Sequence, residues 1–279
     1  MTILDSDVEL AGQSDIVFSV VPPRDAVETA QRIIDALPGA ARDAGRPPLY
    51  FADLNAVAPS TCKAIAALFA RDAASVRFVD GSIIGGPPSL RPAATASDEA
   101  GAGDEAPAWY RPLVPTSGPH DLTTAFPALA ETLRSRHIGA EVGAASGLKM
   151  CFASMSKGYS AIATQAFATA QALGVLADLR WALGEVAPGR VRQTEAALTG
   201  MPPKAYRWVR EMEEISATFA EEGGFAPDLF RGCAGVFRAV AEDTVLGAEK
   251  IGQRKRGRTA EDVAAAVAEG LAAKRKKTE

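Results

Sequence analysis

The chain has 279 residues, of which 47% are hydrophobic and 23% are charged, and 34 acidic against 30 basic side chains give a formal net charge of −4. This balance is typical of a globular protein of one or two domains. The acidic excess excludes a dedicated nucleic-acid-binding protein, because such proteins carry a strong basic surplus.

The sequence contains three cysteines without C-x-x-C spacing and only two histidines. These residues provide neither a metal site nor a disulfide framework, so we expect reduced thiols and no bound metal. No segment approaches the roughly 18 consecutive apolar residues of a membrane span. The first residues lack the basic and apolar regions of a secretory signal. We therefore expect a cytoplasmic protein with no membrane partner.

The first half of the chain alternates short apolar runs with helical patterns, which predicts a parallel sheet covered by helices. The first run ends at the pair Pro22-Pro23, because proline cannot donate a hydrogen bond to a sheet. The pattern predicts strands over 15–22, 49–54 and 76–80 and helices over 24–37 and 60–70.

Residues 89–112 are rich in proline, alanine, glycine and acids and show no hydrophobic period. This composition predicts a long flexible insertion, which is either a disordered surface loop or a lid over a site. After it, the sequence predicts a strand and turn from Leu113, an amphipathic helix over 121–136 and a last strand over 138–142.

From Gly143 onward the pattern is helical only, beginning with a long helix that ends at Gly174. Further helices are expected over 176–184, 191–198, 203–222, 228–246 and 260–274. The fold class is therefore α/β plus all-α. We expect a partial Rossmann-like parallel-sheet domain over residues 1–142 and a helical domain over residues 143–279, each large enough to fold alone.

Two faces are expected on the long helix. The apolar face carries Leu148, Phe152, Met155, Tyr159, Ile162 and Ala166, and the opposite face carries Lys149, Ala153, Ser156, Ser160 and Thr164. A lone lysine on a polar helix face is usually solvated. Lys149, however, follows the small residues of Gly143-AASGL-Leu148 near the expected domain junction, where ligand sites prefer to lie. Burial there would lower its pKa and suit it to proton transfer.

Three predicted strands end at the same edge of the sheet, the edge at which open α/β sheets bind ligands. The strand ends are Val21-Pro22-Pro23, Asp53-Leu54-Asn55 and the diglycine Gly85-Gly86. The diglycine is either a tight turn that needs positive φ or a pair of backbone N–H groups that hold a carboxylate or phosphate.

These segments, in this order, resemble the β-hydroxyacid dehydrogenase superfamily, which includes 3-hydroxyisobutyrate and 6-phosphogluconate dehydrogenases. The fourth Rossmann strand of the family is similar to SDIVFSVVPP, and its next strand and turn are similar to FADLNAVAP. The substrate segment D-x-P-V-S-G-G is similar to VDGSIIGGPP, and the catalytic-lysine helix to GAASGLKMCFASMSKG. The later helices resemble a 6-phosphogluconate dehydrogenase C-terminal-like domain through MPPKAYRWVREMEEISATFAEEGG and FRGCAGVFRAVAEDT.

The resemblance implies an oxidoreductase in which NAD or NADP takes a hydride from a small hydroxy acid while Lys149 acts as general base. It places the substrate at Ser82, Gly85 and Gly86 and the cofactor at Val21, Pro22, Pro23 and Asn55. It also implies a homodimer formed through the helical domain.

Three departures from the family pattern are visible. The serine of S-G-G is Ile84, with Ser82 as a partial replacement, and the asparagine one turn after the lysine is Ala153. The chain has no G-x-G-x-x-G loop for a pyrophosphate and starts at the equivalent of the fourth strand, so we expect an N-terminally truncated relative. The alternative function is that of a non-catalytic binding or dimerisation module.

Overall fold

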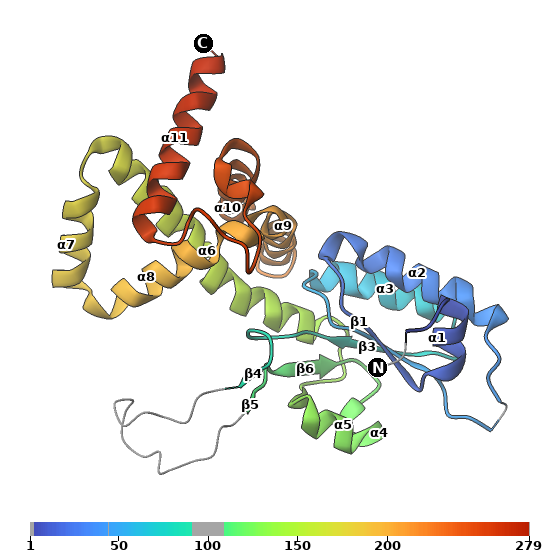
Figure 1. Cartoon of the computed structure of the whole chain (residues 1–279). Helices are drawn as coiled ribbons and strands as arrows, with labels where there is room; N and C mark the ends of the chain where they lie inside the picture. Colours follow the sequence, from blue (N-terminus) through green and yellow to red (C-terminus); the bar gives the residue numbers. More distant parts are fainter. Residues whose placement is uncertain (1–2, 44, 91–108, 279) are drawn as a thin grey trace. The chain divides into compact units, whose positions relative to one another are not determined.

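The computed structural model describes residues 3–43, 45–90 and 109–278. It divides into two compact units, Met1–Lys149 and Met150–Glu279. The boundary expected after residue 142 lies just before helix α6 (Ala144–Leu173), whereas the units divide inside that helix. Figure 1 shows the sheet with its helices in the first unit and helices alone in the second, as the sequence predicts.

The first unit contains a five-stranded sheet in the order β1-β2-β3-β6-β7. Its strands are β1 (Ile16–Ser19), β2 (Tyr50–Asp53), β3 (Arg77–Gly81), β6 (Val114–Ser117) and β7 (Ser135–His137). The first three are parallel, β6 is antiparallel to β3, and β7 is parallel to β6. The mainly parallel sheet confirms the predicted α/β class of this unit. The sequence pattern did not predict that β6 runs antiparallel to β3.

Both faces of this sheet are covered by packed side chains. Successive residues of β2 point to opposite faces, so this strand contributes to a core on each side. Phe51 packs in one core with residues of α2 (Ala26–Ala36) and α3 (Pro59–Asp72), and its ring centroid lies 4.6 Å from that of Phe69. Tyr50 and Ala52 belong to a second core on the other face.

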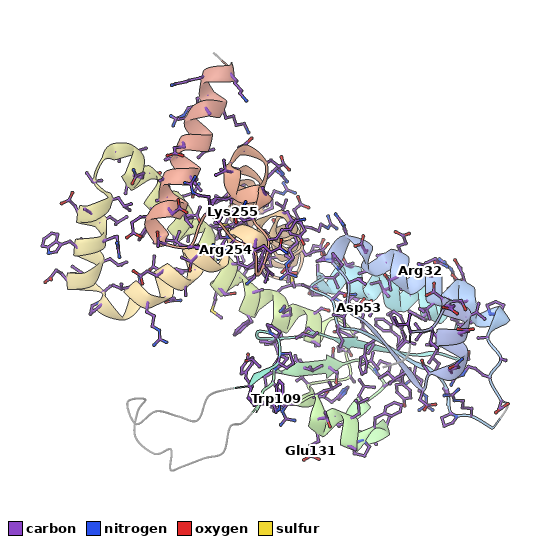
Figure 2. All side chains as sticks on the ribbon, viewed as in Figure 1. Arg32, Asp53, Trp109, Glu131, Arg254 and Lys255 are labelled. Atoms are coloured by element: carbon purple, nitrogen blue, oxygen red, sulfur yellow. The ribbon has the colours of Figure 1, made fainter. Side chains whose placement is uncertain are left out.

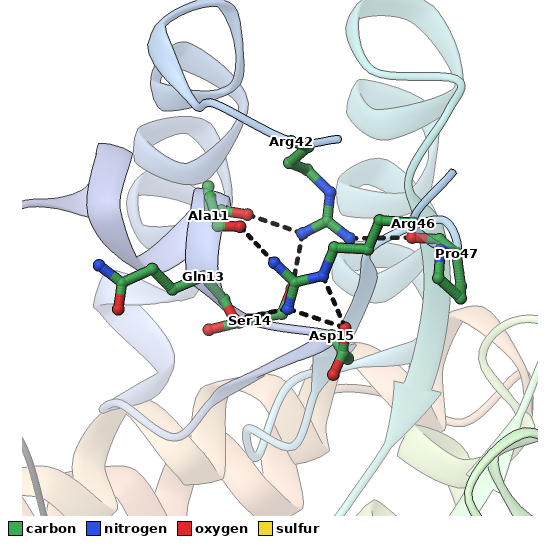
Figure 3. A network of polar contacts seen from close by, with 8 residues as sticks. Ala11, Gln13, Ser14, Asp15, Arg42, Arg46 and Pro47 are labelled. Atoms are coloured by element: carbon green, nitrogen blue, oxygen red, sulfur yellow. Dashed lines mark hydrogen bonds and ion pairs between the residues drawn. The ribbon is translucent and has the colours of Figure 1, made fainter. Parts of the chain in front are cut away.

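Helix α1 (Asp7–Gln13), which the sequence pattern did not predict, is held at its C-terminal end by two arginines (Figure 3). Arg42 donates to the carbonyl oxygens of Ala11 (2.9 Å) and Ser14 (2.6 Å). Arg46 donates to those of Gly12 (2.5 Å) and Gln13 (2.6 Å). The last carbonyls of a helix have no partner within it, so the guanidinium groups satisfy them.

The predicted helix over 121–136 is wrong. The segment forms two short helices, α4 (Leu122–Ala125) and α5 (Pro127–Thr132), followed by β7. Proline has no N–H to continue the first helix, and Arg134 adopts φ +52°, which ends the second. The predicted strand over 138–142 is also wrong, because the strand occupies Ser135–His137.

The predicted insertion over 89–112 is ordered at both ends. Ser89–Leu90 (β4) pairs antiparallel with Trp109–Tyr110 (β5), so part of the segment expected to be flexible is a short hairpin stem. Residues 91–108 lie outside the described residues, and the choice between loop and lid stays a prediction.

The second unit is all-helical, as predicted. After α6 come α7 (Leu176–Val186), α8 (Pro188–Gly200), α9 (Ala205–Glu221), α10 (Asp228–Asp243) and α11 (Ala260–Thr278), with single 3₁₀ turns η3 (Pro202–Lys204) and η4 (Val245–Ala248). Its core includes Met212 and Ile215 of α9 and Phe237 of α10. The ring of Trp208 meets Phe237 edge-on at 5.1 Å.

Helix α6 buries part of its predicted polar face and exposes part of its predicted apolar stripe. Ser160 and Thr164, on the expected polar face, are buried, and their hydroxyls donate to the carbonyls of Ser156 (3.1 Å) and Ser160 (2.7 Å). Met155 and Ile162, on the expected apolar stripe, are 70% and 56% exposed. Small side chains with satisfied hydroxyls let other helices approach closely, so they can form the packed face.

Among the described residues, no helix is both long and apolar enough to cross a membrane. The cytoplasmic location expected from the sequence stays a prediction. In the same part of the chain, no group of three or more histidine, cysteine or acidic side chains is arranged to hold a metal.

Candidate functional site

A row of four polar side chains crosses the sheet near the carboxyl ends of its parallel strands β1, β2 and β3. Ser19 is the register partner of Asp53, Asp53 of Asp80, and Asp80 of Ser117. None of the four is more than 2% exposed. Asp53 lies within the first unit, among the strands of the sheet (Figure 2). Buried polar groups are stable only when they are hydrogen-bonded, so each member of this row needs partners.

Asn55 supplies the partners for one half of the row. Its backbone and side-chain N–H groups donate to the Asp53 carboxyl at 2.8 and 3.1 Å, and its Nδ2 also donates to Ser19 Oγ at 2.8 Å. Its Oδ1 accepts from the backbone N–H of Val21 at 2.7 Å. One amide therefore fixes the loops that follow β1 and β2, and it brings the predicted cofactor residues Val21 and Asn55 together.

Burial is the main influence on Asp53. It raises the pKa of this carboxyl from 3.8 to about 6, since the charged form is poorly solvated. The hydrogen bonds from Asn55 lower the pKa in part, and the neighbouring Asp80 raises it again.

Asp80 joins the sheet to the start of α6. Its carboxylate accepts hydrogen bonds from the backbone N–H of Gly143 (2.8 Å) and Ala145 (3.1 Å) and from the Ser146 hydroxyl (2.6 Å). The Ser117 hydroxyl also donates to it at 2.7 Å. An aspartate from a strand thus satisfies N–H groups that a helix leaves unpaired at its N-terminus, where a negative charge is favourable.

The sheet edge and the helix meet again at Lys149. Its Nζ donates to the carbonyl oxygen of Ile83, and its side chain is half-buried. The fully buried Ser82 donates its hydroxyl to the carbonyl of Ala145 at 3.0 Å. Lys149 therefore lies beside the segment that continues directly into the diglycine.

The diglycine is exposed, and it contacts a residue that the sequence did not single out. Gly85 has φ +123°, so the tight-turn interpretation of this segment is supported. The backbone N–H of Gly86 donates to the hydroxyl of Tyr110 at 3.2 Å.

The structure brings most of the predicted site residues to one edge. Pro22 and Pro23 follow β1 there, with Pro23 opening a 3₁₀ turn and the Pro22 carbonyl accepting from Asp25. The substrate and cofactor contacts of all the predicted residues stay predictions. Sequence reasoning placed Asp53 at a strand end and Asp80 in the family-like segment without giving either a role, and it did not single out the insertion residue Tyr110. Asp53 and Asp80 each stand at the end of an apolar run, and this shared position could have indicated both residues.

Cys62 lies beside this network and provides no nucleophile. Burial raises the pKa of its thiol far above the ordinary value, and nearby Asp80 and Asp53 act in the same direction. Since the thiolate is the reactive form of cysteine, this side chain is structural.

Comparison with known proteins gives one family match to part of the chain, and solved structures with a similar fold. Residues 170–240 match a family model described as "Domain of unknown function (DUF1932)". No curated protein matches the sequence.

Many solved structures have similar folds, and three of them illustrate the likeness. A conserved hypothetical protein from Sinorhizobium meliloti 1021 is 22% identical, with a TM-score of 0.62, over 96% of this chain and 79% of that one. A Mycobacterium tuberculosis 3-hydroxyisobutyrate dehydrogenase solved with L-serine is 20% identical, with a TM-score of 0.56, over 95% and 82%. The 3-hydroxyisobutyrate dehydrogenase from Salmonella typhimurium is 18% identical, with a TM-score of 0.55, over 93% and 82%.

Proposed function

We propose that this chain, which has the fold of the 3-hydroxyisobutyrate dehydrogenases, is an NAD(P)-dependent oxidoreductase of the 3-hydroxyacid and 6-phosphogluconate dehydrogenase type. The observation that carries the proposal is the contact between Lys149 Nζ and the Ile83 carbonyl, which holds a candidate base beside the diglycine.

Lys149 would accept the proton of the substrate hydroxyl. Only the neutral amine can do so, and Lys149 lies half-buried in α6 with its Nζ at the Ile83 carbonyl. The lysine is directed by the Ile83 carbonyl, and its helix is fixed by Asp80. Two independent contacts thus orient the base before substrate arrives, which reduces the entropy lost on reaching the reactive geometry.

Gly85 and Gly86 would bind the acid group of the substrate, because both glycines are exposed at the segment that follows Ile84. Val21, Pro22, Pro23 and Asn55 would hold the nicotinamide end of NAD or NADP. Asn55 would act by fixing the loop backbones that face the cofactor, because its own polar groups are already bonded to Val21, Asp53 and Ser19. The nicotinamide, when bound, supplies the hydride acceptor.

Cofactor binding is the first test, because the 279 residues contain no G-x-G-x-x-G loop. Thermal unfolding of the chain should be measured with increasing NADH and NADPH. A ligand that binds only the folded state raises the melting temperature by mass action. We expect a rise with at least one cofactor, whereas no shift at millimolar concentrations of both would instead support a non-catalytic binding module.

Turnover is the second test. Reduction of NAD or NADP should be followed with a panel of 3-hydroxy acids, using Lys149→Met and, as the matched control, Lys276→Met in the exposed last turn of α11. We expect only the Lys149 variant to lose turnover while it keeps cofactor-induced stabilisation. Equal turnover in the two variants would remove Lys149 from the reaction.

A homodimer formed through the helical unit is part of the proposal. It is supported by the apolar stripe of α6, where Met155 and Ile162 are largely exposed and Phe152 is 46% exposed. Large exposed apolar patches mark surfaces that bind other proteins.

A further inference from the structure

Tyr110 lies against the diglycine of the proposed substrate site. It belongs to β5, at the end of the 89–112 segment, and its hydroxyl accepts a hydrogen bond from the Gly86 N–H. A β-carbon at Gly85 would collide with that same hydroxyl oxygen. The absence of a side chain at Gly85 therefore lets the phenol reach the backbone.

The position of Tyr110 is held by backbone contacts on both sides. Before it, β5 pairs with β4, with Tyr110 opposite Ser89. After it, Leu113 and Ile84 exchange two backbone hydrogen bonds of 2.8 and 2.9 Å. These contacts tie the segment that carries Tyr110 to the segment that carries the diglycine.

Two arginines add a further anchor between these contacts. Arg111 donates to the carbonyls of Glu131 (3.2 Å) and Thr132 (2.9 Å) in α5, and Arg134 donates to the carbonyl of Arg111 at 2.9 Å. The neighbouring Trp109 is 64% exposed (Figure 2). Tyr110 is thus placed by its surroundings, whereas the Trp109 side chain in the same strand is largely exposed.

Tyr110 places a hydroxyl group at the diglycine, which the neighbouring residues 82 and 84 do not. Position 84, just before the diglycine, is a buried isoleucine. Ser82 is fully buried and donates to Ala145, so its hydroxyl is engaged with α6. The Tyr110 hydroxyl instead lies at the exposed glycines themselves.

We propose that Tyr110 is a substrate-binding residue that donates its hydroxyl hydrogen to the acid group of the substrate. A phenol can accept one hydrogen bond and donate another at the same time, so the contact with Gly86 N–H orients the oxygen without preventing donation. This inference rests on the proposed function, because it assigns Tyr110 to the same acid-binding segment. It also gives the ordered ends of the 89–112 segment a role in choosing acidic substrates.

The test compares Tyr110→Phe with the wild-type chain and with Trp109→Phe, a control in the same strand whose ring is largely exposed. Steady-state oxidation of 3-hydroxypropionate should be measured together with oxidation of 1,3-propanediol, which lacks the acid group. A hydrogen bond to a charged group stabilises by about 1.5–3 kcal/mol, which corresponds to roughly 10- to 150-fold. We expect Tyr110→Phe to raise the KM for the acid by that factor and to leave the KM for the diol and for the cofactor unchanged.

The outcomes separate this inference from the proposed function. If the wild-type chain oxidises the acid and Tyr110→Phe behaves like Trp109→Phe, the role of Tyr110 is wrong and the proposed function stands. If no hydroxy acid is oxidised, the proposed function fails, and thermal stabilisation by 3-hydroxypropionate decides the inference alone. Stabilisation that is lost in Tyr110→Phe would support an acid-binding role, and its absence in the wild-type chain would overturn it.

Discussion

Asp80 at the end of β3 and Ser146 in the first turn of α6 are joined by two hydrogen bonds. The Ser146 hydroxyl donates to one carboxylate oxygen at 2.6 Å, and its backbone N–H donates to the other at 3.3 Å. Lys149 lies three residues further along the same helix. The orientation of the candidate base thus depends on a side chain that contacts neither substrate nor cofactor in the proposed mechanism.

Replacing Asp80 with asparagine should destabilise the first unit. The asparagine amide would direct N–H groups at partners that are themselves donors, which leaves buried groups unsatisfied. We expect a loss of about 3 kcal/mol in the free energy of unfolding, measured by urea denaturation. Ser117→Ala removes only one of the donors and should cost about 1 kcal/mol. Similar losses in both variants would contradict a central role for the carboxylate.

The buried Asp53 should make stability depend on pH. Its pKa is about 6 in the folded chain against 3.8 ordinarily, so between these values the unfolded chain releases a proton that the folded chain retains. The free energy of unfolding therefore falls as pH rises through this window, by about 3 kcal/mol in total. Asp53→Asn should flatten this decline in denaturation curves recorded across the window.

Asp72→Asn is the matched control for Asp53. Asp72 is exposed, and its hydrogen bond with Arg71 lowers its pKa, so its titration lies below the window in which Asp53 acts. The control should keep the wild-type slope of stability against pH. If Asp53→Asn kept the wild-type slope as well, Asp53 would already be ionised across this pH window in the folded chain. Burial would then not raise its pKa as proposed.

The sequence was sufficient for the class of fold because both units show their periodicity directly. The apolar runs that form β1, β2 and β3 end at prolines, polar residues or glycine. In the later helices, apolar residues recur every three or four positions. The helix expected over 121–136 failed because its apolar spacing is compatible with several short elements, and Pro127 decides between them. Helical periodicity alone also did not show that the small polar face of α6 would be buried.

The site was predictable only where it resembles a known pattern. Lys149 and the diglycine could be recognised from their local sequence. Tyr110 follows a long segment without hydrophobic period, so no local spacing links it to Gly86. The hydrogen bond between them depends on the pairing of β4 with β5, which joins residues on either side of the insertion. Asp80 belongs to the family-like segment VDGSIIGGPP, but its partners at Gly143 to Ser146 are distant in the chain.

The exposed stripe of α6 gives the last prediction, which concerns assembly. A second copy of the chain that covers this stripe would bury Met155 and Ile162, and a glutamate at either position would then place an unpaired charge in an apolar interface. We expect the double variant Met155→Glu, Ile162→Glu to shift the chain from dimer to monomer in analytical ultracentrifugation. Because both side chains are largely exposed in the single chain, the fold of the monomer should be preserved, as far-ultraviolet circular dichroism can check.

Val186→Glu provides the control for this experiment. Val186 is 85% exposed at the end of α7 and lies outside the α6 stripe, so the same change there adds charge without affecting the proposed interface. Its sedimentation should equal that of the unmodified chain. A wild-type chain that sediments as a monomer at all concentrations tested would exclude the homodimer. A dimer that persists in the α6 double variant would place the interface on another surface of the molecule.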